Sequence, residues 1–155
     1  MYFMGEFVVG APRAAVYEKI RDPEFFVSCV DGVRNLQEVD ATHYTAVVES
    51  KIAYLKVVFQ VLVELVREQA PVFIEVKIEG RPLKMGGRLS ATSVTRLEEV
   101  VCGTKVLYET NLLLTGKLGS LGRPVLIAKA KTIEKQFSEN LQNVFTLINS
   151  DSDTK

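Results

Sequence analysis

Residues 57–79, VVFQVLVELVREQAPVFIEVKIE, decide the fold of this chain. Apolar residues occupy every odd position from Val57 to Leu65 and, after a turn at residues 69–71, every even position from Val72 to Ile78. A period of two is typical of a strand that buries one face and exposes the other to water. The stretch therefore predicts two antiparallel strands, Val57–Glu68 and Val72–Glu79, that share one apolar face.

The same alternation continues outward in both directions and predicts five more strands. Their expected bounds are Tyr2–Val9, Val33–Val39, Tyr44–Ile52, Arg88–Glu98 and Lys105–Thr115. A turn is expected at Ala53–Lys56 and a loop at Gly80–Gly87. Between the first two strands, Pro12 and the pair Asp22-Pro23 are typical of helix starts, so two short helices are predicted there.

Residues 126–148 change the period from two to three or four. The apolar residues that recur at this spacing are Leu126, Ala130, Ile133, Phe137, Leu141 and Ile148. They predict an amphipathic helix of about six turns, whose only large apolar partner is the inner face of the sheet. We therefore expect an α+β fold in which a seven-stranded curved antiparallel sheet wraps around a long C-terminal helix, with residues 1–149 as one domain and 150–155 as a polar tail. This arrangement resembles the helix-grip fold of START and Bet v 1-like (polyketide cyclase-like) proteins, which enclose a cavity between sheet and helix.

The composition argues against several classes of protein. Lys plus Arg and Asp plus Glu both number 19, and a net charge of zero is unusual for a nucleic-acid binder, which carries a basic excess. No apolar stretch reaches the roughly 18–20 residues of a membrane-spanning helix. Met1–Gly10 lacks the basic and apolar regions of a signal peptide. We therefore expect a cytoplasmic protein that has no nucleic-acid partner.

Potential metal ligands and nucleophiles are few and scattered. His43 is the only histidine, and Cys29 and Cys102 lie far from it in sequence, whereas a zinc site needs three or four closely spaced ligands. The nucleophile motif G-x-S-x-G is absent, and the glycines at 86–87 and 116–119 do not match a nucleotide-binding loop. We expect no metal, no cofactor and no catalytic residue. We also expect no disulfide, because the topology sets the two cysteines at opposite ends of the sheet.

Scattered positions over about residues 3 to 148 resemble the carbon monoxide dehydrogenase G-subunit family. They are Phe7–Pro12 with Val16, Asp22–Glu24, Cys29–Val33, Tyr44, Lys51, Phe59, Pro71, Gly80, Gly86-Gly87, Gly103-Thr104, Gly116–Gly122 and Phe137–Leu141. The chain departs from the family at three turns, with Gly10 where Pro is common, Asp31-Gly32 for Pro-Gly and Ala53-Tyr54 for Gly-Pro. The resemblance implies a cavity for a lipid-like or quinone-like small molecule. It also implies a role in attaching a molybdenum hydroxylase, of the carbon monoxide dehydrogenase type, to the inner membrane face.

The predicted cavity is almost wholly apolar. Of the inward-facing strand residues only Ser93, Tyr108 and Thr110 are polar, so no carboxylate is expected to line the cavity. This pattern favours a binding protein over a cyclase- or hydrolase-like enzyme, which stays the alternative. The expected ligand-binding residues are Phe59, Val61, Val76, Ile78, Leu89, Ala91, Tyr108, Thr110, Leu112, Leu126, Ala130, Ile133 and Phe137.

Three segments that mix basic and apolar residues are expected to meet at one end of the sheet. Their candidate membrane or partner contacts are Tyr54, Leu55, Lys56, Leu83, Lys84, Met85, Lys117, Leu118, Leu121 and Arg123. Basic residues beside apolar ones suit an anionic lipid surface. The alternative is that the leucines of this set close the end of the core. A third function class, a homodimeric interaction module, follows from the apolar row Val58, Leu62 and Val66 on the outer sheet face.

Overall fold

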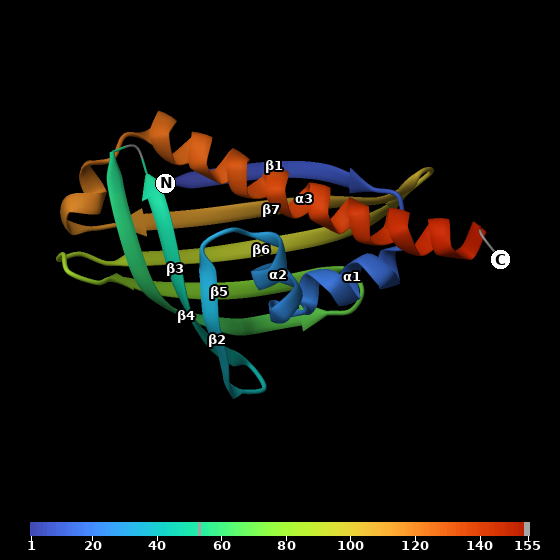
Figure 1. Cartoon of the computed structure of the whole chain (residues 1–155), viewed down its shortest axis with the longest axis horizontal. Coiled ribbons are helices and arrows are strands. Elements are labelled where there is room, and N and C mark those ends of the chain that lie inside the picture. The colour runs from blue at the N-terminus through green and yellow to red at the C-terminus, as the bar shows by residue number, and fades with distance from the viewer. Residues whose placement is uncertain (53, 154–155) are drawn as a thin grey trace.

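The computed structural model describes residues 1–52 and 54–153, with side chains as far as residue 146. It has the predicted α+β architecture, a single sheet with one long helix packed on it (Figure 1). The elements are β1 (Tyr2–Val9), α1 (Arg13–Arg21), α2 (Pro23–Cys29), β2 (Val33–Asp40), β3 (His43–Ile52), β4 (Leu55–Gln69), β5 (Phe73–Pro82), β6 (Leu89–Val100), β7 (Gly103–Leu114), the 3₁₀ helix η1 (Gly116–Ser120) and α3 (Arg123–Asp153).

The seven strands lie in the order β1-β7-β6-β5-β4-β3-β2, and every neighbouring pair is antiparallel. The pairs Val63 with Ile78, Ile78 with Ala91, and Ala91 with Leu112 carry one face across four strands. This is the predicted inner face. The alternation of apolar and polar residues therefore determined the orientation of each strand correctly, because a slip of one residue would have turned the face outward.

The strand ends differ from the prediction in two places. β5 continues through Gly80 to Pro82, so the first part of the predicted loop Gly80–Gly87 is strand. Gly80 is buried there opposite Val61, and a Cβ on it would approach the Leu89 Cβ to 3.3 Å. The glycine thus marks a close approach within the sheet and not a break in it. At the other end of the hairpin, β4 already begins at Leu55.

The helices begin where the sequence predicts. Asp22 accepts a hydrogen bond from the Glu24 backbone N–H at 3.0 Å, and Pro23 is the first residue of α2. α3 begins at Arg123 and extends to Asp153, whereas the predicted polar tail begins at residue 150. Figure 1 shows α3 crossing β1 and β7 obliquely, with α1 and α2 beside its C-terminal half.

The apolar interior consists of two separate clusters of buried residues. The first cluster joins α1 and the C-terminal half of α3 to one end of the sheet, and it contains Val9, Ala11, Val16, Tyr17, Ile74, Leu97, Val106, Leu141 and Phe145. The second cluster joins η1 to the other end, and it contains Ala46, Val57, Phe59, Val61 and Leu118. The inner face between them is the subject of the next section.

Candidate ligand-binding site

The inner face of the sheet is incompletely covered between the two core clusters. Ser93, Tyr108, Thr110 and Leu112 all point to this face, yet each is only half-buried. Ala130 and Ile133 of α3 are also half-buried and belong to neither cluster. The middle of the molecule, which we call the central gap and define by these six residues, therefore keeps surface that side chains do not fill.

A tyrosine–glutamate pair crosses the central gap. Tyr108 of β7 donates a hydrogen bond of 2.8 Å from its hydroxyl to Oε1 of Glu134 on α3. Burial raises the pKa of Tyr108 above its ordinary value, and the hydrogen bond to Glu134 raises it further. Tyr108 is therefore a neutral phenol at physiological pH. Gly5 of β1 lies opposite Tyr108, and a Cβ at this position would overlap the Tyr108 hydroxyl and come within 2.7 Å of Glu134 Oε1.

The pair corrects one prediction from the sequence. The strand register is as predicted, but a carboxylate does reach the interior, because α3 supplies it. Glu134 lies four residues after Ala130 and eight after Leu126, so all three share one helix face. This spacing was present in the sequence and would have placed Glu134 inside.

A second polar pair lies on the neighbouring strands. The hydroxyls of Ser93 on β6 and Thr110 on β7 are 3.0 Å apart, and either can donate. Thr110 is two residues from Tyr108 on the same face of β7, so the two pairs form one polar centre within an otherwise apolar surface.

An apolar pocket opens at one end of the central gap. Its volume is about 150 Å³, and it is lined by Met1, Leu112, Leu113, Leu114, Leu118, Gly119, Leu121 and Leu126. Leu112 and Leu126 were predicted to line a cavity of ligand size, roughly 300 Å³ or more. The pocket is therefore at the predicted place for these two residues and smaller than predicted. A larger pocket of about 390 Å³ lies outside the interior and is mostly charged, with Glu18, Arg21, Asp22, Pro23, Glu24, Leu36, Glu38 and Tyr44 around it.

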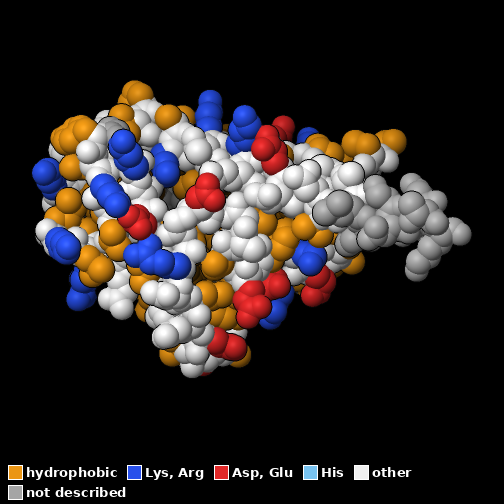
Figure 2. Space-filling model, in the orientation of Figure 1, with side chains coloured by type: hydrophobic (Ala, Val, Ile, Leu, Met, Phe, Trp, Pro, Cys, Tyr) orange, Lys and Arg blue, Asp and Glu red, His pale blue; other side chains and the backbone are white. Residues whose placement is uncertain are grey.

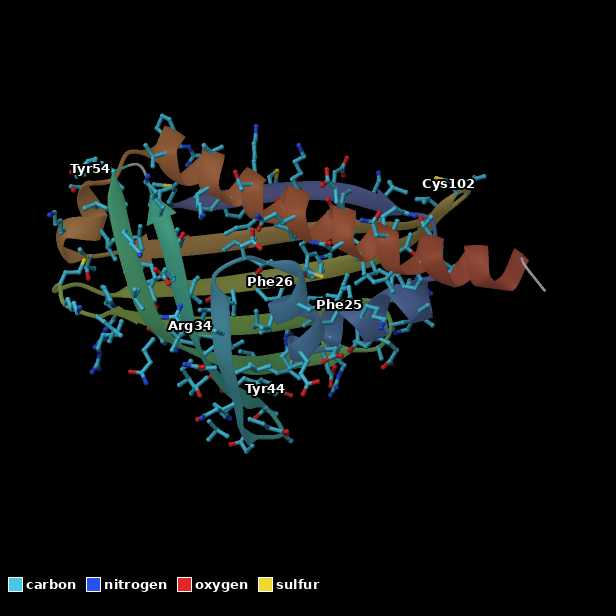
Figure 3. The ribbon with its side chains drawn as sticks, in the orientation of Figure 1. Phe25, Phe26, Arg34, Tyr44, Tyr54 and Cys102 are labelled. Atoms are coloured by element: carbon cyan, nitrogen blue, oxygen red, sulfur yellow. The ribbon has the colours of Figure 1, made fainter. Side chains whose placement is uncertain are left out.

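The remaining predicted ligand-binding residues divide between the clusters and the gap. Phe59, Val61 and Ala91 are buried, and Val76, Ile78 and Leu89 are half-buried and pack against a cluster. Phe137 lies within an aromatic group, with ring centroids 6.4 Å from Phe7, 6.1 Å from Phe25 and 5.5 Å from Phe26. Figure 3 shows Phe25 and Phe26 beside α3. Phe137 therefore closes the first cluster against the gap.

The three mixed basic and apolar segments lie at one end of the sheet. Leu55, Met85 and Leu121 all pack against the second cluster, and Leu118 within it is completely buried. Leu118 is therefore a core residue, which corrects its assignment as a membrane or partner contact. Tyr54 and Leu83 remain exposed, at 80% and 45%. Figure 2 shows Lys and Arg side chains gathered with hydrophobic ones at this end, and Figure 3 places Tyr54 there and Cys102 at the opposite end.

The other singled-out residues show no sign of a reactive site. Cys29 is buried, Cys102 is exposed, and both are free thiols. His43 lies next to Asp40, with 2.8 Å between Nδ1 and Oδ1, and caps the β2–β3 turn. Among the residues that the structure describes, no three His, Cys, Asp or Glu side chains come together in a way that could hold a metal ion. The described helices include none with the length and apolar character to cross a membrane.

A second tyrosine–glutamate pair lies away from the central gap. Tyr17 of α1 donates to Glu68 Oε2 at 2.6 Å, and Arg21 donates to both Glu68 oxygens at 2.7 and 3.0 Å. Burial and the Glu68 hydrogen bond raise the pKa of Tyr17 to about 12, and the hydrogen bonds from Arg21 and Tyr17 lower the pKa of Glu68. This triad joins α1 to the end of β4.

Comparison with known proteins identifies similar sequences and folds. A family model described as the G subunit of carbon monoxide dehydrogenase (CoxG) matches residues 5–146. A conserved protein from Geobacillus kaustophilus has a similar solved structure, with a TM-score of 0.85 and 21% identity over 94% of this chain and 95% of that one. The Zhui aromatase/cyclase from Streptomyces sp. R1128 has a TM-score of 0.67 and 12% identity, covering 92% of each chain. Ara h 8.0201 has a TM-score of 0.63 and 15% identity, covering 92% of this chain and 98% of that one. No curated protein matches the chain. The structural matches show a shared helix-grip fold.

Proposed function

The chain belongs to the CoxG family of carbon monoxide dehydrogenase, and from this premise we propose that it is a non-catalytic binding protein for a lipid-like or quinone-like small molecule. The ligand lies between α3 and the inner face of the sheet. The observation that supports this proposal most directly is the central gap, where half-buried Leu112, Ala130 and Ile133 join neither core cluster. Apolar surface left open inside a fold is costly in water and gains free energy when an apolar ligand covers it.

The ligand contacts combine the gap with the inner walls of the two clusters. Ile78 and Leu89 form the wall toward the second cluster, and Val76 and Phe137 form the wall toward the first. Since the open pocket of about 150 Å³ is smaller than a lipid-like ligand, α3 and η1 move away from the sheet when the ligand enters.

An apolar fluorescent dye, N-phenyl-1-naphthylamine, tests the proposal, with decylubiquinone as the competitor. The variant Ala130→Phe fills the gap, and we expect it to weaken dye binding at least tenfold. Ala128→Phe makes the same change on an exposed position of α3 and is the matched control, which should bind like the wild type. Failure of the wild-type protein to bind the dye, or equal binding by Ala130→Phe, would overturn the proposal. Native mass spectrometry of protein from its own host would then identify a retained ligand.

The family also supports an accessory role, in which the protein attaches a molybdenum hydroxylase of the carbon monoxide dehydrogenase type to the inner membrane face. We assign the contact to the basic end, defined as Tyr54, Lys56, Leu83, Lys84, Lys117 and Arg123. Tyr54 and Leu83 are exposed apolar side chains, and the four basic residues around them are exposed too. Each basic residue near an anionic bilayer contributes about 1 kcal/mol to binding.

Sedimentation with anionic vesicles tests the basic end. The triple variant Leu83→Ser, Lys84→Glu, Lys117→Glu reverses two charges and removes one apolar contact, so it should no longer sediment with phosphatidylglycerol vesicles. A control that reverses Lys77 and Lys105, which lie on the outer face of the sheet, should sediment like the wild type. The assignment fails when the wild type stays in the supernatant, or when the triple variant sediments equally well.

Two other functions keep a specific observation in their favour. A cyclase- or hydrolase-like enzyme would use Tyr108 and Glu134, since they are the phenol and carboxylate that meet in the interior. A homodimeric interaction module would use the outer face of β4, where Leu62 and Val66 are exposed. Turnover assays on aryl esters and the mass of the protein in solution distinguish these functions from simple ligand binding.

A further inference from the structure

We propose that the polar centre selects a ligand that carries a hydroxyl group on an apolar body, in preference to one that carries a carbonyl, an ether or a carboxylate. The polar centre is the set Tyr108, Glu134, Ser93 and Thr110. This inference rests on the proposed function, because it names the chemistry of a ligand that the central gap would hold. Among quinone-like ligands it favours the reduced, hydroxyl-bearing form.

The hydrogen atoms of the polar centre are mostly committed within it. Tyr108 has one hydroxyl hydrogen and gives it to Glu134, so its oxygen can only accept from a ligand. Glu134 is a carboxylate and only accepts, and the hydrogen bond from Tyr108 is its sole polar contact among the described side chains. Ser93 and Thr110 share one hydrogen between them and keep one free. Acceptors therefore outnumber free donors, and a ligand that donates fits best.

The charge on Glu134 adds selection against acids. No Lys or Arg forms an ion pair with Glu134 among the side chains that the structure describes, so its negative charge is not neutralised inside the gap. A ligand carboxylate placed here would be repelled in a medium of lower dielectric constant than water. A hydroxyl donor to Glu134 instead forms a charge-assisted hydrogen bond, which is about twice as strong as a neutral one.

The geometry of α3 and β7 gives the direction of the apolar body. Leu126 and Leu112 line the same pocket, and Glu134 and Tyr108 are hydrogen-bonded, so the helix and strand run side by side in opposite directions between these two points. The distance along the helix is about 12 Å at 1.5 Å per residue. Along the strand it is about 13 Å at 3.3 Å per residue. A ligand with its hydroxyl at Tyr108 and Glu134 therefore extends its apolar body toward the pocket.

The matched probes are 4-nonylphenol, 4-nonylanisole and 4-nonylbenzoate, which share one apolar body and differ in the head group. Their dissociation constants are measured at neutral pH by displacement of the apolar dye. We expect the phenol to bind at least about tenfold more tightly than the anisole, since its hydroxyl donates to a charged acceptor. We expect the benzoate to bind most weakly. Glu134→Gln should bring the three constants together, whereas the exposed control Glu139→Gln should leave the order unchanged.

The outcomes separate this inference from the proposed function. Equal binding of phenol and anisole to the wild type overturns the hydroxyl preference and leaves the ligand-binding function in place. Dye binding that no probe displaces, or no dye binding at all, overturns both. A phenol preference that persists in Glu134→Gln overturns the role of Glu134. Thermal unfolding checks that this variant folds, and Tyr108→Phe supplies a second test, because it keeps the charge and should still exclude the benzoate.

Discussion

Tyr17 and Tyr108 each donate a hydrogen bond to a glutamate, but the two pairs differ in what surrounds the carboxylate. At Glu68, Tyr17 and the guanidinium of Arg21 together supply three hydrogen bonds. At Glu134, the Tyr108 hydroxyl supplies one, and no basic residue is paired with the carboxylate among the described side chains. The first carboxylate is therefore nearly saturated, and the second keeps acceptor capacity.

The difference teaches how one pair of residue types performs two tasks. Tyr17 is only 1% exposed and belongs to the first core cluster, so its hydroxyl needs Glu68 to avoid burial without a partner. Tyr108 faces the central gap, where water or a ligand can replace a lost partner. We infer that the Tyr17–Glu68–Arg21 triad stabilises the fold and that the Tyr108–Glu134 pair is available for binding.

The largest effect is expected from removing the two carboxylates in turn. Glu68→Ala leaves a buried tyrosine hydroxyl without a partner and should lower the free energy of unfolding by about 2–3 kcal/mol. Glu134→Ala should lower it by less than about 1 kcal/mol, because the Tyr108 hydroxyl in the gap can hydrogen-bond to water. Urea unfolding monitored by circular dichroism measures both. Equal losses would remove the distinction between the two pairs.

The fold follows from the sequence because its main signals are local. The period of two in residues 57–79 determined which side of β4 and β5 is buried, and the apolar spacing from Leu126 onward required a helix on that side. Neither signal depends on exact packing. The strand count, the order of the elements and the inner face were therefore predictable, and the resemblance to the carbon monoxide dehydrogenase family agrees with the family match over residues 5–146.

The site was less predictable because it depends on contacts between distant segments. Glu134 meets Tyr108 across 26 positions and Tyr17 meets Glu68 across 51. The curvature of the sheet decides both meetings, and no local pattern encodes it. The same curvature divides the interior into two clusters and buries Leu118, where the sequence alone indicated one continuous cavity and a surface leucine.

Acid titration sharpens the comparison. Hydrogen bonds from Arg21 and Tyr17 lower the pKa of Glu68 in the folded protein, so its ionised form is favoured by folding. The resulting stability is fully present above the unfolded pKa, about 4.3, and is lost as the pH falls through the lower folded value. The difference in unfolding free energy between wild type and Glu68→Gln should therefore shrink as the pH is lowered from about 6 to about 3. A difference that stays constant over this range contradicts the assigned stabilisation.

Gly5 offers a way to disturb the Tyr108–Glu134 pair without removing either residue. A Cβ at Gly5 would overlap the Tyr108 hydroxyl, so Gly5→Ala should force the tyrosine away from Glu134 and cost about 1–2 kcal/mol of stability. The matched control is Gly86→Ala, because a Cβ there has no atom within 4 Å. Thermal unfolding compares the two. An unchanged transition for Gly5→Ala would mean that Tyr108 moves freely in the gap.

The smallest expected difference comes from removing each phenol oxygen. Tyr17→Phe takes away one of the three hydrogen bonds to Glu68 and leaves the ring in place, so it should cost about 1 kcal/mol. Tyr108→Phe should change stability by less than about 0.5 kcal/mol, because water can solvate Glu134 in the half-open gap. Chemical denaturation with fixed slopes resolves differences of this size when both variants are measured beside the wild type. If Tyr108→Phe proves the more costly of the two, the pair in the gap is a structural contact, and the polar centre would have no spare acceptors to offer a ligand.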